Sequence, residues 1–157
     1  MSTQRRSFTV TQEPRGEQYR ALLGEALRHC DRFSLVQRSE CIIDEAAKKV
    51  LVELSPHLRE ERTVSEWPGT KLLGGTATLR EYELSEASAA ILGRVAEGLY
   101  DWCQPARPED LVLWRASDGP WLVTIAHERD AYFEVTAAER DELFRAIPAL
   151  SSVIEAG

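Results

Sequence analysis

The sequence has few cysteines, and none of them falls in a recognisable pair. Cys30, Cys41 and Cys103 are widely spaced, and no CxxC motif or other metal-type cluster occurs in the 157 residues. Disulfide frameworks use even sets of cysteines and zinc sites use clustered thiols, so we expect neither. Unpaired thiols are typical of a reducing cytosol. We therefore expect a cytoplasmic protein with no bound metal and no cofactor.

Long apolar runs are also missing. No stretch approaches the ~20 apolar residues that a membrane helix needs. The first ten residues, MSTQRRSFTV, contain two arginines but no apolar run behind them, so we expect no signal peptide and no membrane contact. The composition, 43% hydrophobic and 29% charged, is ordinary for a folded globular protein and argues against disorder.

Catalytic signatures are scarce. The motifs GxSxG, HExxH, GxGxxG and the Walker pattern are absent, and no cysteine has a protease signature. One cluster could do chemistry: His127 stands beside Glu128, and Asp118 lies at the other end of the same expected strand. A histidine near carboxylates can act as a general base, which predicts a small hydrolase or transferase as an alternative function. The simpler interpretation is a charged hairpin turn.

Beyond the first quarter of the chain, acidic residues outnumber basic ones. Residues 1–38 carry seven arginines against four acidic residues, whereas residues 110–157 carry nine acidic residues against four basic ones, and the formal net charge is −7. Nucleic-acid binding depends on Lys and Arg contacts to phosphates, so a nucleic-acid partner is disfavoured. An acidic surface favours a basic protein partner, with plain solubility as the alternative explanation.

Tryptophan, by contrast, is plentiful, with four residues in the chain. Tryptophan is a frequent hot spot of protein interfaces, although each one could equally pack in the core. Trp67 begins a Trp-Pro-Gly turn and is either an anchor folded onto the body of the protein or an exposed contact. The binding surface that we predict consists of Trp67, Asp118, Trp121, Glu128 and Asp130.

Apolar periodicity divides the chain into alternating helices and strands. Within 110–136, three short apolar runs separated by turn residues predict an antiparallel meander. Thr136 and Glu139 have the spacing of a capping box, and Ser85 is a candidate N-cap. The charged stretch 57–63 is expected to be a solvated exit from a helix. The predicted strands outside the meander are 7–12, 33–37 and 76–84, and the predicted helices are 19–31, 40–54, 85–103 and 136–147.

This order predicts an α+β sandwich in a single domain spanning 1–157. The sheet is expected to be mixed or antiparallel, to end in the three-stranded meander, and to be covered by about four helices, mainly on one face. Short flexible ends are expected at 1–6 and 151–157.

Four sequence strings add a resemblance. WPGT at 67–70, PEDL at 108–111, DGPWL at 118–122 and AHE followed by DA at 126–131 resemble an uncharacterised family of small bacterial proteins. That family carries no activity that could be transferred to residues here. In size, acidity and α+β layout the chain is also loosely similar to bacterial immunity proteins, which neutralise toxins.

The sequence thus predicts a cytosolic protein-binding module of the immunity or inhibitor type, which binds a basic partner through an acidic surface that carries tryptophan. The alternatives are the His127 enzyme and a purely structural homodimer, for which Gly93 and Gly98 on the expected 85–103 helix could supply a close-packed face.

Overall fold

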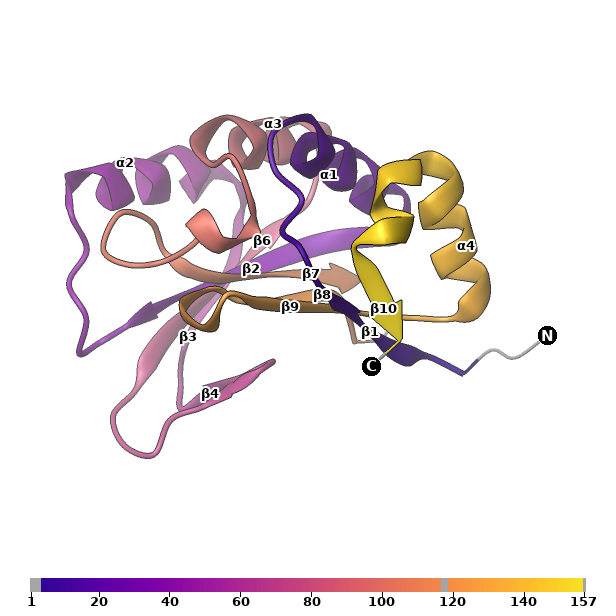
Figure 1. Cartoon of the computed structure of the whole chain (residues 1–157). Coiled ribbons are helices and arrows are strands. Elements are labelled where there is room, and N and C mark those ends of the chain that lie inside the picture. Colours follow the sequence, from indigo (N-terminus) through magenta and orange to yellow (C-terminus); the bar gives the residue numbers. More distant parts are fainter. Residues whose placement is uncertain (1–3, 117–118, 157) are drawn as a thin grey trace.

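The computed structural model describes residues 4–116 and 119–156, and in it a layer of helices covers one face of an antiparallel sheet (Figure 1). The sheet order is β10-β1-β9-β8-β7-β2-β6-β3, and every pairing between these strands is antiparallel. The predicted α+β fold, with its β7-β8-β9 meander, is confirmed. The strands of this sheet are β1 Arg6–Val10, β2 Cys30–Arg38, β3 Leu58–Val64, β6 Ala77–Glu83, β7 Glu109–Arg115, β8 Pro120–Ile125, β9 Asp130–Val135 and β10 Ile154–Ala156.

The described residues form four α-helices, as expected from their apolar stripes. Ser85 and Thr136 begin α3 and α4, and each forms a capping box in which the side chain three residues later returns a hydrogen bond. Asp44 begins α2 by accepting a hydrogen bond from the backbone N–H of Ala47. No helix in the described part of the chain is both long and apolar enough to cross a membrane. The helices are α1 Glu17–His29, α2 Glu45–Leu54, α3 Glu86–Val95 and α4 Ala137–Ala146, and the short 3-10 turns are η1 Ser55–His57, η2 Leu99–Asp101, η3 Ala126–Glu128 and η4 Pro148–Ser152.

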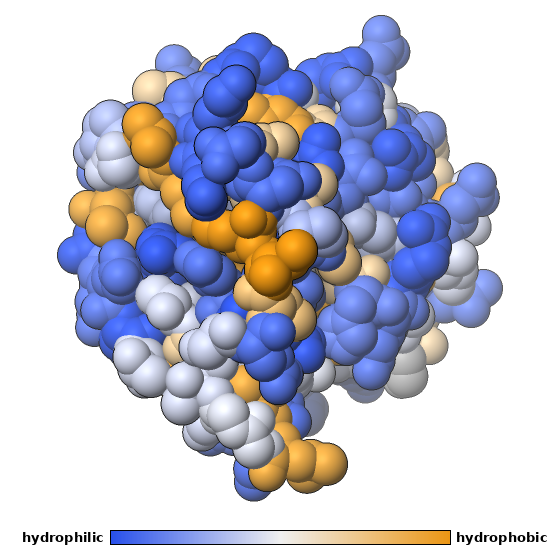
Figure 2. Space-filling model, turned by 90° about the vertical axis from the view of Figure 1, so that its left-hand side faces the viewer, coloured by the Kyte–Doolittle hydropathy of each residue, from blue (hydrophilic) through white to orange (hydrophobic). Residues whose placement is uncertain are grey.

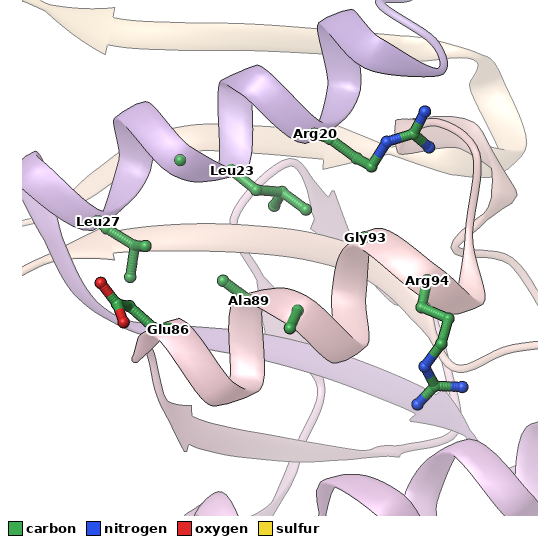
Figure 3. A pocket seen from close by; sticks show the side chains of 9 residues that line it. Arg20, Leu23, Leu27, Glu86, Ala89, Gly93 and Arg94 are labelled. Atoms are coloured by element: carbon green, nitrogen blue, oxygen red, sulfur yellow. The ribbon is translucent and has the colours of Figure 1, made fainter.

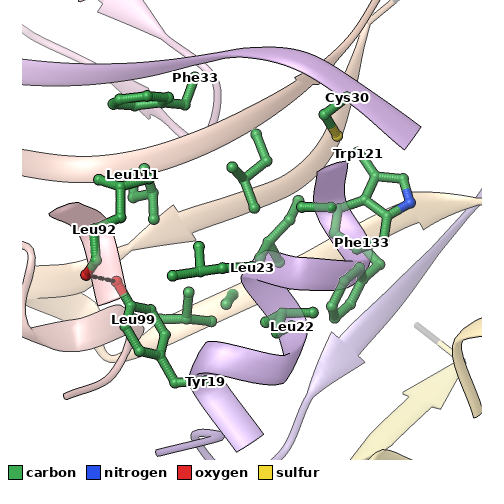
Figure 4. Close-up of a cluster of buried hydrophobic side chains, with 14 of the residues drawn as sticks. Tyr19, Leu22, Leu23, Cys30, Phe33, Leu92, Leu99, Leu111, Trp121 and Phe133 are labelled. Carbon is green, nitrogen blue, oxygen red and sulfur yellow. Dashed lines mark hydrogen bonds between the residues drawn. The ribbon is translucent and has the colours of Figure 1, made fainter. Parts of the chain in front are cut away.

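The main core lies between the helices and the sheet, and α1 contributes its centre (Figure 4). The hydroxyl of Tyr19 donates to the carbonyl of Leu92 at 2.7 Å and accepts from the indole N–H of Trp102 at 3.0 Å. Burial raises the pKa of Tyr19, so the hydroxyl stays protonated and can donate its hydrogen bond. Two large aromatic side chains therefore lie in the core with their polar atoms satisfied.

A second, smaller core lies on the opposite face of the sheet. There the hairpin of β4 Glu66–Trp67 and β5 Thr70–Lys71 packs Trp67 against Val36, Ala77 and Leu79. The turn at Gly69 has a φ of +88°, and a Cβ at this position would lie 2.7 Å from Cγ1 of Ile125. The interpretation of Trp67 as an anchor is confirmed.

Two predicted elements differ most from the structure. Helix α3 ends at Val95 rather than near 103, because Ala96 is extended and Gly98 forms an isolated bridge with Arg15. A Cβ at Gly98 would lie 2.6 Å from Oε2 of Glu13, so this glycine admits a crossing segment of the same chain. The expected solvated exit at 57–63 is the edge strand β3.

Part of each end that was expected to be flexible forms secondary structure. Arg6 already belongs to β1, and the expected tail at 151–157 contains the end of η4 and the strand β10, which pairs with β1. The backbone N–H of Thr11 donates to the carbonyl of Val153 at 2.7 Å. The residues of this C-terminal segment show no local strand pattern. The backbone hydrogen bonds that β1 provides to it could therefore not be predicted from the sequence.

Candidate functional site

His127 lies in η3, where four segments of the chain converge. The end of β2 brings Arg38, the start of β7 brings Glu109 and Asp110, and the β4–β5 hairpin comes from the far side of the sheet. The His127 side chain is 39% exposed, whereas Glu109 and Asp110 are buried. The nearest ligand atoms of His127, Glu109 and Asp110 all lie within 4.8 Å of one another.

Asp110 is held from two sides. Its Oδ2 accepts from the indole N–H of Trp67 and its Oδ1 accepts from the backbone N–H of Ala126, both at 2.9 Å. Its φ of +58° places it in the left-handed region, which aspartate tolerates better than most residues. A completely buried carboxylate is thereby satisfied by two donors from distant segments.

Glu109 has its own donors. Arg38 donates from Nε to Oε2 at 3.0 Å, and the backbone N–H of Gln104 donates to Oε1 at 3.3 Å. The thiol of Cys103 lies 3.9 Å from Oε1, and burial together with the charge of Glu109 raises its pKa, so this thiol is not activated.

Arg38 links Glu109 to His127. Its guanidinium stacks 5.4 Å from the ring centre of Trp67, and its Nη2 lies 3.3 Å from Nδ1 of His127. A guanidinium only donates, so Nδ1 is the acceptor and the neutral ring carries its proton on Nε2. We call the set of Arg38, Trp67, Glu109, Asp110 and His127 the polar network.

The hydrogen bonds of the polar network tie β2, β7 and the β4–β5 hairpin together. Each oxygen of the two carboxylates already accepts from an N–H donor, and the guanidinium of Arg38 places a positive charge beside Glu109. Nδ1 of His127 already accepts from the guanidinium of Arg38, so its lone pair is occupied in this structure. Glu128, the predicted partner of His127, is an exposed side chain 3.9 Å from Nε2, and Asp118 lies outside the described residues.

An open basin of about 820 Å³ adjoins the polar network. Its lining residues are Arg38, Glu40, 69–74, His127 and Glu128. Leu73, in this lining, is 106% exposed. A leucine that contacts nothing in its own chain is unusual at the edge of a polar hollow.

The surface of the molecule carries further apolar groups. Figure 2 shows the left-hand side of Figure 1, with an interrupted apolar band across a mostly hydrophilic surface. Ile42 and Val52 are 79% and 73% exposed. Ser39 donates its backbone N–H to the carbonyl of Thr76 at 3.1 Å, which holds the loop containing Ile42 beside the loop containing Leu73.

The structure corrects the predicted binding surface. Trp67 and Trp121 are 6% and 1% exposed, so neither can contact a partner, and that part of the prediction is wrong. Trp121 stacks on His29 with ring centres 5.4 Å apart. Glu128 lines the basin and Asp130 is half-buried at the start of β9.

Sequence reasoning also missed five residues that matter here: Arg38, Glu40, Leu73, Glu109 and Asp110. One signal was available for two of them. Adjacent acidic residues at the start of an apolar strand require buried donors, and Glu109 and Asp110 precede the run from Leu111.

A second hollow of about 410 Å³ lies between α1 and α3 (Figure 3). Leu23 and Leu27 point towards Ala89 across it, with Arg20 and Arg94 at one end and Glu86 at the other. A Cβ at Gly93 would lie 3.4 Å from Cγ of Arg20. Gly93 and Gly98 both serve contacts within the chain, so they no longer support a homodimer through this helix.

Comparisons with models of known protein families, with curated proteins and with solved structures found no match.

Proposed function

We propose that this protein works by binding another protein, and that the contact surface is the rim of the basin beside the polar network. We call the set of Glu40, Ile42, Leu73 and Glu128 the basin surface. The observation that carries the proposal is the complete exposure of Leu73 in the lining of a hollow large enough to receive partner side chains.

Apolar exposure supplies the driving force. Removing a leucine side chain from water is worth about 1.5–3 kcal/mol; Leu73 is fully exposed and Ile42 is 79% exposed, so most of this gain is still open to a partner. Interfaces commonly surround such an apolar centre with a polar rim. Here Glu40 and Glu128 supply that rim.

Charge favours a basic partner. The basin surface contains two glutamates. The lining contains two positively charged side chains, Arg38 and Lys71, and the charge of Arg38 is already balanced by Glu109. With an overall charge of −7, the chain attracts a basic protein over long range. A partner of this kind fits the immunity or inhibitor class, in which an acidic protein covers a basic enzyme. The three free thiols, one of them exposed, favour the cytoplasm as the compartment.

The polar network gives the surface a rigid base. The hairpin is held by the Trp67–Asp110 hydrogen bond and by the stacking of Arg38, so little ordering is needed when a partner binds.

The test is affinity capture of the tagged protein from its own host, with mass spectrometry at low and moderate salt. We expect one stoichiometric basic protein that is released as salt rises, and that is lost with Leu73→Asp and with the double variant Glu40→Lys/Glu128→Lys. The matched control is Asp141→Lys/Glu155→Lys, which makes the same charge change on α4 and β10. Capture that survives both basin variants, or that is lost equally in the control, contradicts the proposed surface.

A further inference from the structure

The outer edge of β3 is an unused strand edge at one end of the sheet. β3 pairs with β6 on one side, and among the described residues no strand pairs with its other side (Figure 1). Its residues from Leu58 to Thr63 are all exposed. The opposite edge of the sheet, β10, is only three residues long. An edge of seven residues presents a row of backbone donors and acceptors that another strand can use.

The sequence of β3 is complementary to itself. In an antiparallel pairing of two copies about a two-fold axis through Glu61, Glu60 of each copy stands opposite Arg62 of the other. Glu60 and Arg62 share one face of the sheet, since they are in register with Glu81 and Leu79 on β6. Residues directly opposite each other must share a face, so this register is geometrically allowed.

The four charges in this register alternate in sign. Within one chain Nη1 of Arg62 already lies 3.3 Å from Oε2 of Glu60. The second copy places another Arg62 beside that glutamate and another Glu60 beside that arginine. Opposite charges across an antiparallel pair stabilise it.

One like-charge contact remains, and the fold already compensates it. Glu61 stands opposite its own copy, but Nε of Arg80 on β6 lies 3.4 Å from Oε2 of Glu61. Moving the axis to Arg62 would instead place two arginines opposite each other. Moving it to Glu60 would place two copies of Glu60 opposite each other and would bring the bulge between Leu58 and Glu60 next to the axis, whereas in the proposed register the bulge lies at the ends of the pairing.

We propose that two copies of this chain associate through the outer edges of β3 in this register. The two sheets then form one continuous sheet, with the helices of both copies on the same face. Charged residues on an edge strand normally prevent pairing with other strands. Here they still exclude foreign strands and shifted registers, but they accept a second copy.

Charge reversal tests this pairing directly. Sedimentation velocity over a concentration series should show a reversible monomer–dimer equilibrium. Glu60→Arg and Arg62→Glu should each weaken the homodimer by about tenfold or more, because four like charges then meet. An equimolar mixture of the two variants should dimerise again, since each reversed residue faces its complement, and the double variant Glu60→Arg/Arg62→Glu should recover the homodimer. Lys49→Glu, an exposed reversal on α2, is the control and should leave the equilibrium unchanged.

Hydrogen exchange gives a second measurement that does not depend on the variants. Backbone amides within 58–64 should become more protected as the concentration of the wild-type protein rises. A protein that stays monomeric at every concentration overturns the proposal. So does a dimer that is indifferent to the single reversals, a mixture of variants that fails to associate, or protection that does not change with concentration.

Discussion

The indole N–H of Trp67 donates to a carboxylate oxygen of Asp110 at 2.9 Å, across 43 residues of sequence. This bond joins the β4–β5 hairpin to the first residues of β7 through the face of the sheet that the helices leave uncovered. Arg38 stacks on the same indole and pairs with Glu109. The position of the basin surface therefore depends on a buried polar contact rather than on the main hydrophobic core.

Replacement of Trp67 by phenylalanine should show how much the Trp67–Asp110 hydrogen bond contributes to the free energy of unfolding. Trp67→Phe keeps most of the apolar bulk but leaves Oδ2 of a buried carboxylate without its donor, which costs about 1–3 kcal/mol of unfolding free energy. Urea denaturation measures the loss. Trp114→Phe is the matched control, because its indole donates to the neutral hydroxyl of Ser34 at 2.8 Å and the side chain is only half-buried. Equal losses in the two variants would contradict the special role of the Asp110 contact.

The turn at Gly69 should be intolerant of a side chain. Gly69→Ala combines a left-handed backbone with a Cβ placed 2.7 Å from Cγ1 of Ile125, and we expect at least about 1–2 kcal/mol of destabilisation from the backbone alone. In an Ile125→Ala background the additional cost should shrink, because the clashing atoms are gone.

Gly24→Ala provides the opposite control for this substitution. Gly24 lies within α1, and nothing lies within 4 Å of a Cβ added there. Alanine should therefore stabilise the protein by about 0.5–1 kcal/mol. Thermal unfolding of the four variants is the measurement, and a Gly69→Ala protein as stable as wild type would show that the turn is not constrained.

Acid should weaken the contact between α4 and the sheet. Burial alone would raise the pKa of Glu139, but the backbone N–H of Thr136 and the guanidinium of Arg115 outweigh it, and the pKa lies below its ordinary value. Arg115 donates to both oxygens of Glu139 at 2.8 Å. A lowered folded-state pKa means that this stability is complete above the ordinary glutamate pKa of about 4.3 and is lost as the pH falls through the folded-state value.

Glu139→Gln should therefore flatten the decline of unfolding free energy with falling pH below about pH 4.3. Chemical denaturation at a series of pH values measures this slope. Asp141→Asn removes one negative charge from an exposed position on the same helix and controls for the change in net charge. An unchanged slope in Glu139→Gln would show that the Arg115 contact contributes nothing to acid sensitivity.

Two leucines should behave in opposite ways. Leu73→Ser should change the unfolding free energy by less than about 0.5 kcal/mol, because the side chain contacts solvent only. Leu122→Ala should cost about 2–5 kcal/mol, because that side chain is completely buried in the main core. Urea denaturation distinguishes the two, and a large loss in Leu73→Ser would mean that Leu73 packs within the chain and is not free for a partner.

Much of the fold could be predicted because its signals are local. The apolar stripes of α1 to α4, the capping boxes at Ser85 and Thr136, and the turns of the meander each involve residues within a few positions of one another. Strand β3 could not be predicted in this way. Both of its faces are charged, since it lies at the edge of the sheet, so neither the alternation of a half-buried strand nor the apolar run of a buried strand is present.

Only a few residues near the candidate site could be identified from the sequence, and the groups that surround them could not. His127 and Glu128 were singled out because of their residue types, yet the groups that surround His127 come from β2, β7 and the β4–β5 hairpin. The tryptophans misled for a related reason: an indole suits an interface and a core equally well, and the sequence does not show which side chains cover it.

The sequence by itself determined most of the helices and strands, β3 and β10 excepted, because hydrophobic periodicity and capping act over one or two turns of chain. It also determined the acidity and the α+β class. The tertiary structure alone decided that Trp67 and Trp121 are buried while Leu73 is exposed, and that Arg38, Glu109, Asp110 and His127 meet. Burial and long-range hydrogen bonding depend on which strands become neighbours, and β1 pairs with β10, which lies near the other end of the chain.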